Sequence, residues 1–270
     1  MTQRWSSEHA AGPEAVTGAP TQRVGTTAPV GQPVADWDSA EAWQARSRIV
    51  LTPVAAPSIL GLFGFAGATF MVASLLAGWW GNPVVSAPVL APFALFFGGL
   101  AQLLAGMWAY RARDAVATAM HGTWGAFWLA YGLLILLVAG HVLPVTAPFS
   151  VAFGFWFVVL AVVTIFGALA ALANNLSLFV VLALLAAGSA LLAAGLIGGS
   201  AGTIAVGGWV LVASAAAAFY TAGAMMLAQA SGGRTVLPLG RPSAAANIPG
   251  RQASAPIDYP AGMPGARVGQ

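Results

Sequence analysis

The sequence predicts an all-α membrane protein whose six transmembrane helices form one pore-containing protomer. Only 6% of the 270 residues are charged and 59% are hydrophobic, whereas a soluble domain carries about 25% charged residues. Between Val50 and Gly232 the only charged residues are Arg111, Arg113 and Asp114. The same central part contains six apolar segments, each close to the roughly 20 residues that a helix needs to cross a bilayer.

This composition also excludes several classes of function. The ten basic residues are all arginines and form no cluster, so nucleic acid is not an expected partner. The absence of cysteine excludes disulfides, thiolate metal sites and a cysteine nucleophile. No catalytic triad, carboxylate pair, metal-spaced histidine set or phosphate-binding loop is recognisable. We therefore expect neither an enzyme nor a resident cofactor or metal.

Each predicted span ends at residues that interrupt an apolar helix. The first closes at Gly81-Asn82-Pro83, the third at Pro144 and the fourth near Asn174-Asn175, while glycine pairs follow the fifth and sixth. Because the loops between spans are short, neighbouring helices should pack antiparallel. The predicted spans cover about residues 58–80, 87–110, 118–143, 147–172, 176–197 and 203–229.

The arginines outside the spans predict the orientation. In a six-span arrangement all of them lie on one side of the membrane, and the loops on the other side contain none. A five- or seven-span arrangement breaks this agreement. The positive-inside rule then places both termini in the cytoplasm. We expect the membrane to be the plasma membrane. We expect residues 1–48 and 242–270, rich in Pro, Ala and Gly, to be disordered tails around a transmembrane domain at 49–241.

The second span, around Phe93–Tyr110, has a face of small residues and a face of large ones. Since lipid gives apolar side chains no reason to segregate, a small-residue stripe indicates a helix–helix contact. A similar stripe in the last span fits close packing between subunits. Gln102 lies beside the first stripe, where an unpaired amide costs several kcal/mol. It should pair with another helix or face water, and we favour contact with a pore. The two stripes are Ala94, Gly98, Ala101, Ala105 and Ala109, and Ser214, Ala218 and Ala222.

Three other spans also carry polar or aromatic residues along one face. Polar groups inside a membrane are costly, so they commonly mark functional sites. Thr69 could instead have a purely structural role, with its hydroxyl bonded to a carbonyl of its own helix. His121 is expected at the lipid headgroups because it lies near the end of its span. The faces are Gly61, Phe65 and Thr69; His121, Trp124, Trp128 and Tyr131; and Leu182, Leu185 and Ser189.

No predicted span contains Asp, Glu, Lys or Arg. This argues against a buried carboxylate relay for protons and against a cage for a bare cation. A small neutral or anionic solute fits better, because hydroxyls, amides and helix N-termini can hold it. Pro57, just before the first span, marks one such N-terminus.

Three segments resemble one known family, the acetate uptake transporters, also called succinate–acetate permeases. The first is similar to the family's Asn-Pro-Ala-Pro-Leu-Gly-Leu signature and the Phe and Thr after it. The last resembles the sequence that closes bacterial members. The resemblance covers about residues 56–240, in order and at the expected spacing. The segments are Ala56–Leu62 with Phe65 and Thr69; Phe96–Gln102 with Ala105–Trp108 and Trp124–Trp128; and Gly233–Gly240.

The resemblance implies a six-helix protomer with a central, hourglass-shaped path, assembled as a homo-hexamer in the bilayer. Its implied substrates are acetate and other short-chain carboxylates, including succinate. In the family a Phe, a Tyr and a Leu pinch the path. By motif these positions are Phe65, Trp124 and Leu185 in this chain. A hydrophobic constriction of this kind can gate by dewetting.

Moving an anion through a hydrophobic ring requires hydrogen-bond donors on both sides. We expect the side chains of Thr69 and Gln102 to supply them, together with backbone N–H groups near Pro57 and Gly61 at the inner mouth. Whether the path works as a proton symporter or as an anion channel stays open at this point.

The chain departs from the family pattern at several positions. The signature's Asn is Ala56 and its second Pro is Ile59. The family's Glu after Met-Trp is Ala109, and its following Asn is Asp114. Two rival functions therefore remain: a non-transporting membrane scaffold or regulator, and an exporter of ammonia or a small neutral metabolite.

Overall fold

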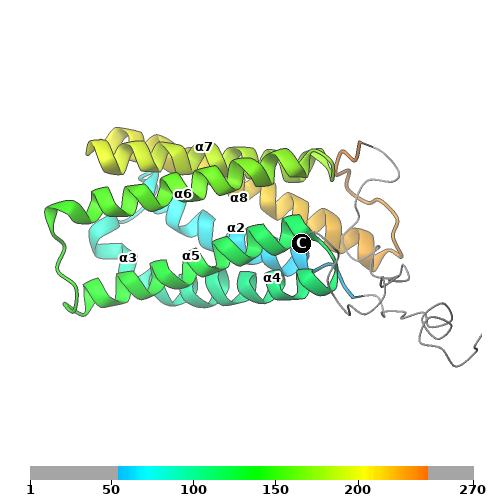
Figure 1. Cartoon of the computed structure of the whole chain (residues 1–270), viewed down its shortest axis with the longest axis horizontal. Coiled ribbons are helices and arrows are strands. Elements are labelled where there is room, and N and C mark those ends of the chain that lie inside the picture. The colour runs from blue at the N-terminus through cyan, green and yellow to red at the C-terminus, as the bar shows by residue number, and fades with distance from the viewer. Residues whose placement is uncertain (1–53, 243–270) are drawn as a thin grey trace, which may run out of the picture. The chain divides into compact units, whose positions relative to one another are not determined.

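The computed structural model describes residues 54–242, and this part of the chain consists of helices joined by short loops (Figure 1). Six stretches are long and apolar enough to cross a membrane, which confirms the predicted number of spans. The predicted tails lie almost wholly outside the described residues. The helices are α2 (Pro57–Leu76), α3 (Pro83–Phe93), η1 (Ala94–Leu100), α4 (Ala101–Arg111), α5 (Ala115–Ala139), α6 (Ala147–Ala171), α7 (Leu176–Gly198) and α8 (Ala201–Ala230).

Helix boundaries follow local capping. The side chains of Asp114, Asn175 and Ser200 accept hydrogen bonds from the backbone N–H three residues on, at the starts of α5, α7 and α8. α7 ends before Gly199, whose φ of 68° lies in the left-handed region that glycine tolerates. Because Asp114 caps α5, the third span begins at Ala115, three residues earlier than the sequence predicted.

The sequence suggested that the second span is one uninterrupted α-helix, and this was wrong. It consists of α3, the π-helix η1 and α4. Pro88 and Pro92 lie inside α3 and remove two backbone donors, which disturbs the hydrogen-bond ladder ahead of η1. Gln102, at the second position of α4, donates from Nε2 to the Gly98 carbonyl within the π-helix at 2.9 Å. The buried amide therefore bonds one turn back along its own span, not to another helix.

α2 lies in the middle of the domain (Figure 1). It contacts α8 on one side and η1, α4 and α5 on the other, while α6 and α7 pack together beside α8. Neighbouring spans run antiparallel and approach closely at glycines. A Cβ on Gly125 of α5 would lie 2.6 Å from the backbone nitrogen of Leu103 in α4. Small residues thus set the spacing between α4 and α5.

The small-residue stripe of the second span is an internal contact, as predicted. Ala94, Gly98, Ala105 and Ala109 are buried against neighbouring helices, and the large residues on the opposite face are exposed. The second stripe behaves differently from the prediction. Ser214, Ala218 and Ala222 of α8 have no exposed surface within the single protomer, and Ser214 Oγ donates to the Val181 carbonyl of α7. They are used in packing within the protomer, so they give no support to a subunit interface.

Candidate substrate path

A cavity lies between the first halves of α2, α5 and α7, and α4 and α8 complete its wall. It has a volume of about 40 Å³, in a measure by which one water needs roughly 10–15 Å³. It can hold a few waters or one small solute. Its lining residues are Ser58, Leu62, Phe65, Gln102, Asp114, Val116, Ala117, Met120, His121, Trp124, Asn174, Asn175, Leu178, Val181, Leu182, Leu185, Thr221 and Met225.

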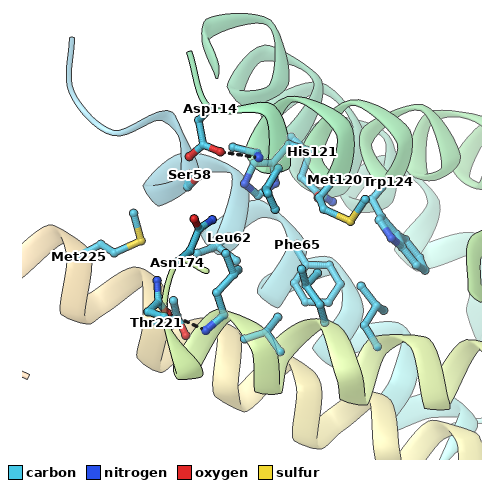
Figure 2. A pocket seen from close by; sticks show the side chains of 18 residues that line it. Ser58, Leu62, Phe65, Asp114, Met120, His121, Trp124, Asn174, Thr221 and Met225 are labelled. Carbon is cyan, nitrogen blue, oxygen red and sulfur yellow. Dashed lines mark hydrogen bonds between the residues drawn. The ribbon is translucent and has the colours of Figure 1, made fainter. Parts of the chain in front are cut away.

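The two ends of the cavity differ in chemistry (Figure 2). We call the end lined by Ser58, Asp114, Asn174, Asn175 and Thr221 the polar end. We call the other end, lined by Phe65, Trp124 and Leu185, the constricted end, after the constriction that the resemblance predicts at these residues. Figure 2 shows Asp114 beside Ser58 at the polar end, while Phe65 and Trp124 lie further along α2 and α5.

Three helices begin at the polar end. α2 starts at Pro57 with no side-chain cap, α5 follows Asp114, and α7 follows Asn175. Helix N-termini carry partial positive charge and unpaired N–H groups, so they attract anions. One N–H group at the start of α5 and one at the start of α7 bond to a side-chain cap, whereas α2 has no side-chain cap. The polar end therefore favours a small anion most strongly near the start of α2.

Asp114 is the acidic residue of the cavity wall. Its Oδ1 accepts a hydrogen bond from the Ala117 N–H at 2.9 Å. Burial raises the pKa of its carboxyl above the usual value for Asp, and the backbone N–H groups of Ala117 and Val116 partly offset this rise. Its position just before α5 places a titratable group in contact with any solute at the polar end.

The constricted end brings together the three residues that the resemblance singled out. Phe65, Trp124 and Leu185 are 3%, 4% and 2% exposed and come from three different helices. The rings of Phe65 and Trp124 meet edge to face with centroids 6.3 Å apart. Trp124 Nε1 donates to Thr164 Oγ1 of α6 at 3.0 Å, and this hydroxyl donates in turn to the Leu160 carbonyl at 2.6 Å. These bonds fix the orientation of the indole.

His121 does not lie at the headgroups, and that expectation was wrong. It is buried and lines the cavity one turn before Trp124. The three-residue spacing from Trp124 already placed both on one face of α5, and this spacing was the better signal. Gly61 is not in the cavity wall but packs behind the imidazole: a Cβ there would lie 2.5 Å from His121 Cε1. Its lack of a side chain leaves room for the ring.

The other predicted donors divide into two groups. Gln102 lines the cavity, as expected for a pore contact. Pro57 is buried at the start of α2, outside the lining set, and Thr69 also lies outside it. Sequence reasoning did not select Asp114, Asn174, Asn175 and Thr221. Asp114, Asn174 and Asn175 lie in loops or at helix ends, where no periodic pattern applies. Thr221 lies on α8, whose small residues the sequence assigned to close packing.

A second group of polar atoms lies beyond the constricted end. Thr69 Oγ1, Trp128 Nε1 and Ser189 Oγ are buried and have no hydrogen-bond partner among the described residues. Each belongs to a residue four positions after Phe65, Trp124 or Leu185 on the same helix. Since α2, α5 and α7 all run away from the polar end, the three groups lie one turn past the constriction residues. We call them the far donors.

These features define a multi-span helical membrane protein with a solute-sized central cavity. Residues 44–238 match the model of the GPR1/FUN34/yaaH family, so the chain belongs to that family. The match confirms the resemblance to acetate uptake transporters.

Individual relatives agree with this placement. The succinate-acetate/proton symporter SatP of Escherichia coli is 31% identical over 189 residues, which are 70% of this chain and 97% of that protein. The structure of the bacterial acetate channel SatP superposes with a TM-score of 0.62 at 30% identity, over 69% of this chain and 99% of the other. Ammonia transport outward protein 2 of Saccharomyces cerevisiae is 34% identical over 80 residues, or 30% of this chain and 28% of that one.

Proposed function

We propose that this protein transports acetate or a related small carboxylate across the plasma membrane. The observation that carries the proposal is the cavity at which three helix N-termini meet and whose wall includes Phe65, Trp124 and Leu185. The names of the relatives support it, since two of them describe acetate or succinate–acetate transport. The protein acts as a path for the solute and performs no covalent chemistry on it.

The mechanism follows from the charge of the solute. Simple carboxylic acids titrate near Glu, at about 4.3, so the solute is mostly an anion at neutral pH. At the polar end the uncapped N-terminus of α2, which reaches the cavity at Ser58, lies near its oxygens, and the amide of Gln102 lines the same cavity. It then passes between Phe65, Trp124 and Leu185 when these side chains swing aside.

Beyond the constriction the far donors replace the hydration that the anion has lost. An unpartnered buried hydroxyl or indole N–H is costly, and a passing carboxylate satisfies it. The sequence predicts this role for Thr69, and we assign it also to Trp128 and Ser189, whose buried polar atoms likewise have no partner among the described residues. Donors on both sides lower the cost of crossing the hydrophobic ring.

Uptake of labelled acetate into proteoliposomes tests the proposal. Vesicles with the purified protein should accumulate acetate faster than empty vesicles, and unlabelled propionate should compete. An inward proton gradient that drives accumulation above equilibrium identifies symport, whereas equilibration alone identifies a channel. If no short carboxylate enters faster than in empty vesicles, the transport proposal is wrong and the scaffold or regulator function takes its place.

A second candidate substrate is ammonia, favoured by the partial similarity to the yeast ammonia transport outward protein. The same vesicles distinguish the two substrates. Excess methylammonium should leave acetate uptake unchanged if a carboxylate is the solute. Strong inhibition by methylammonium, with weak acetate flux, would make ammonia the better assignment.

We further propose that both termini are cytoplasmic and that protomers assemble as a hexamer. The arginine distribution supports the orientation, and the resemblance supports the hexamer. Because the chain has no cysteine, single-cysteine variants near either terminus should be labelled only from the cytoplasmic side. Native mass spectrometry should show six copies; a monomer in mild detergent and in lipid would contradict the assembly.

A further inference from the structure

Asp114 places an unpaired carboxylate in the wall of a cavity assigned above to carboxylate anions. It is 3% exposed, and Figure 2 shows it beside Ser58 at the polar end. Within residues 54–242 its stabilising contacts are backbone N–H groups, and no arginine or histidine forms an ion pair with it. Arg111, three residues earlier, has a buried Nη1 without a hydrogen-bond partner in this range.

Its charge acts differently on solutes of different charge. Coulomb repulsion is proportional to the charge of the solute, so the carboxylate opposes a dianion twice as strongly as a monoanion. Both carboxyl groups of a dicarboxylate are mostly ionised at neutral pH, because their pKa values lie near that of Glu, about 4.3. Asp114 also occupies the N-terminus of α5, a place where a solute oxygen would otherwise be stabilised.

We propose that Asp114 is a specificity-determining residue that excludes dicarboxylate dianions from the cavity and so restricts transport to monocarboxylates. The inference rests on the proposed transport function. A simple capping role explains the bond to Ala117 but does not require a negative charge, since an amide oxygen caps equally well. Asn175 makes the same bond at the start of α7, in the wall of the same cavity. Asp114 and Asn175 therefore form the same kind of cap, but only Asp114 can carry a negative charge.

Exchange of the two caps provides the test. Asp114→Asn keeps a capping oxygen and removes the charge. The ratio of labelled succinate to labelled acetate uptake in proteoliposomes at neutral pH should rise by about fivefold to tenfold. Asp114→Asn combined with Asn175→Asp returns one charge to the cavity on a different helix, and the ratio should fall back toward the wild-type value. Ser200→Asp adds a carboxylate cap on α8, outside the cavity wall, and should leave the ratio unchanged.

Each result has a definite consequence. Acetate uptake that persists in Asp114→Asn with an unaltered succinate-to-acetate ratio overturns the inference and leaves the proposed function intact. A ratio that rises in Asp114→Asn and stays high in the double variant also overturns it, because the effect would then belong to side-chain shape at one position. A changed ratio in Ser200→Asp would also overturn it, because a negative charge outside the cavity would then be enough to alter the ratio. Failure of the wild-type protein to transport any carboxylate would instead remove the proposed function itself.

Discussion

Polar groups around the starts of α2, α5 and α7 differ in their surroundings from the polar groups further along these helices. Around the starts of α2, α5 and α7, polar side chains face a cavity, and the caps Asp114 and Asn175 also bond to backbone N–H groups. One turn past Phe65, Trp124 and Leu185, the far donors are buried without partners. In the proposed path the polar end binds the solute, the far donors contact it during passage, and the constriction separates the two groups.

Breaking the constriction should have the largest effect. Trp124→Ala removes the indole between the two groups, so uptake of monocarboxylates larger than acetate should rise by about tenfold, an effect of about 1.4 kcal/mol on the barrier. Uptake of a series from acetate to butyrate into proteoliposomes measures it. The same change removes a large buried side chain and should lower the free energy of unfolding by about 3–5 kcal/mol.

A matched control separates the path from general loosening. Trp156 of α6 is 62% exposed and lies outside the cavity wall. Trp156→Ala should leave the size profile of transported acids unchanged. An identical profile in Trp124→Ala would remove Trp124 from the path.

The far donors can be tested through a pair of threonines. Thr69→Val removes a hydroxyl that has no partner, so acetate uptake should fall by about fivefold while thermal stability stays constant or rises, since an unsatisfied buried group costs about 1–3 kcal/mol. Thr164→Val removes the acceptor of the Trp124 indole N–H and should lower thermal stability. Uptake and melting temperature are measured on both variants. Loss of stability in Thr69→Val without loss of uptake would contradict a role in passage.

The difference between the two groups also explains what the sequence could predict. Six spans, their antiparallel order and the faces holding Phe65, Trp124 and Leu185 follow from apolar length and helical period, and the structure contains them. The polar end was largely missed, because Asn174 lies in a loop and Asp114 was noted only as a charge between spans and as a departure from the family pattern. Capping and convergence of helix N-termini depend on how distant segments meet. The π-helix at η1, which follows Pro88 and Pro92, was missed because apolar length alone does not distinguish it from an α-helix.

A smaller effect should come from the glycine behind His121. Gly61→Ala places a methyl group where the imidazole lies, at 2.5 Å from Cε1, so the ring must shift toward the cavity. Acetate uptake should fall by about threefold, or roughly 0.7 kcal/mol. Gly223→Ala in α8 is the control, because a Cβ there meets no atom within 4 Å. Equal uptake in both variants would show that the position of His121 does not affect the path.

The smallest effect concerns pH at the polar end. Burial raises the pKa of Asp114 above its ordinary value of about 3.9, so the carboxyl gains its proton at a higher pH than a free Asp does. Lowering the pH removes the charge, and the excess succinate-to-acetate ratio of Asp114→Asn over wild type should shrink toward one. Protonation of succinate also weakens its repulsion by Asp114, so the two proteins are compared at pH values where succinate remains a dianion, above the carboxyl pKa of about 4.3.

The other groups around the cavity do not supply the same response. His121 of α5 is the other titratable side chain in the described cavity wall, whereas α2 and α7 contain none. α4 contributes Gln102 to the wall and ends in Arg111, and α8 contributes Thr221 and Met225. His121→Gln should therefore keep the pH dependence of the ratio, since Asp114 is still present. If the pH dependence of the ratio vanished in His121→Gln and persisted in Asp114→Asn, it would belong to the histidine. The polar end would then respond to pH through the imidazole of His121 and not through Asp114, the cap of α5.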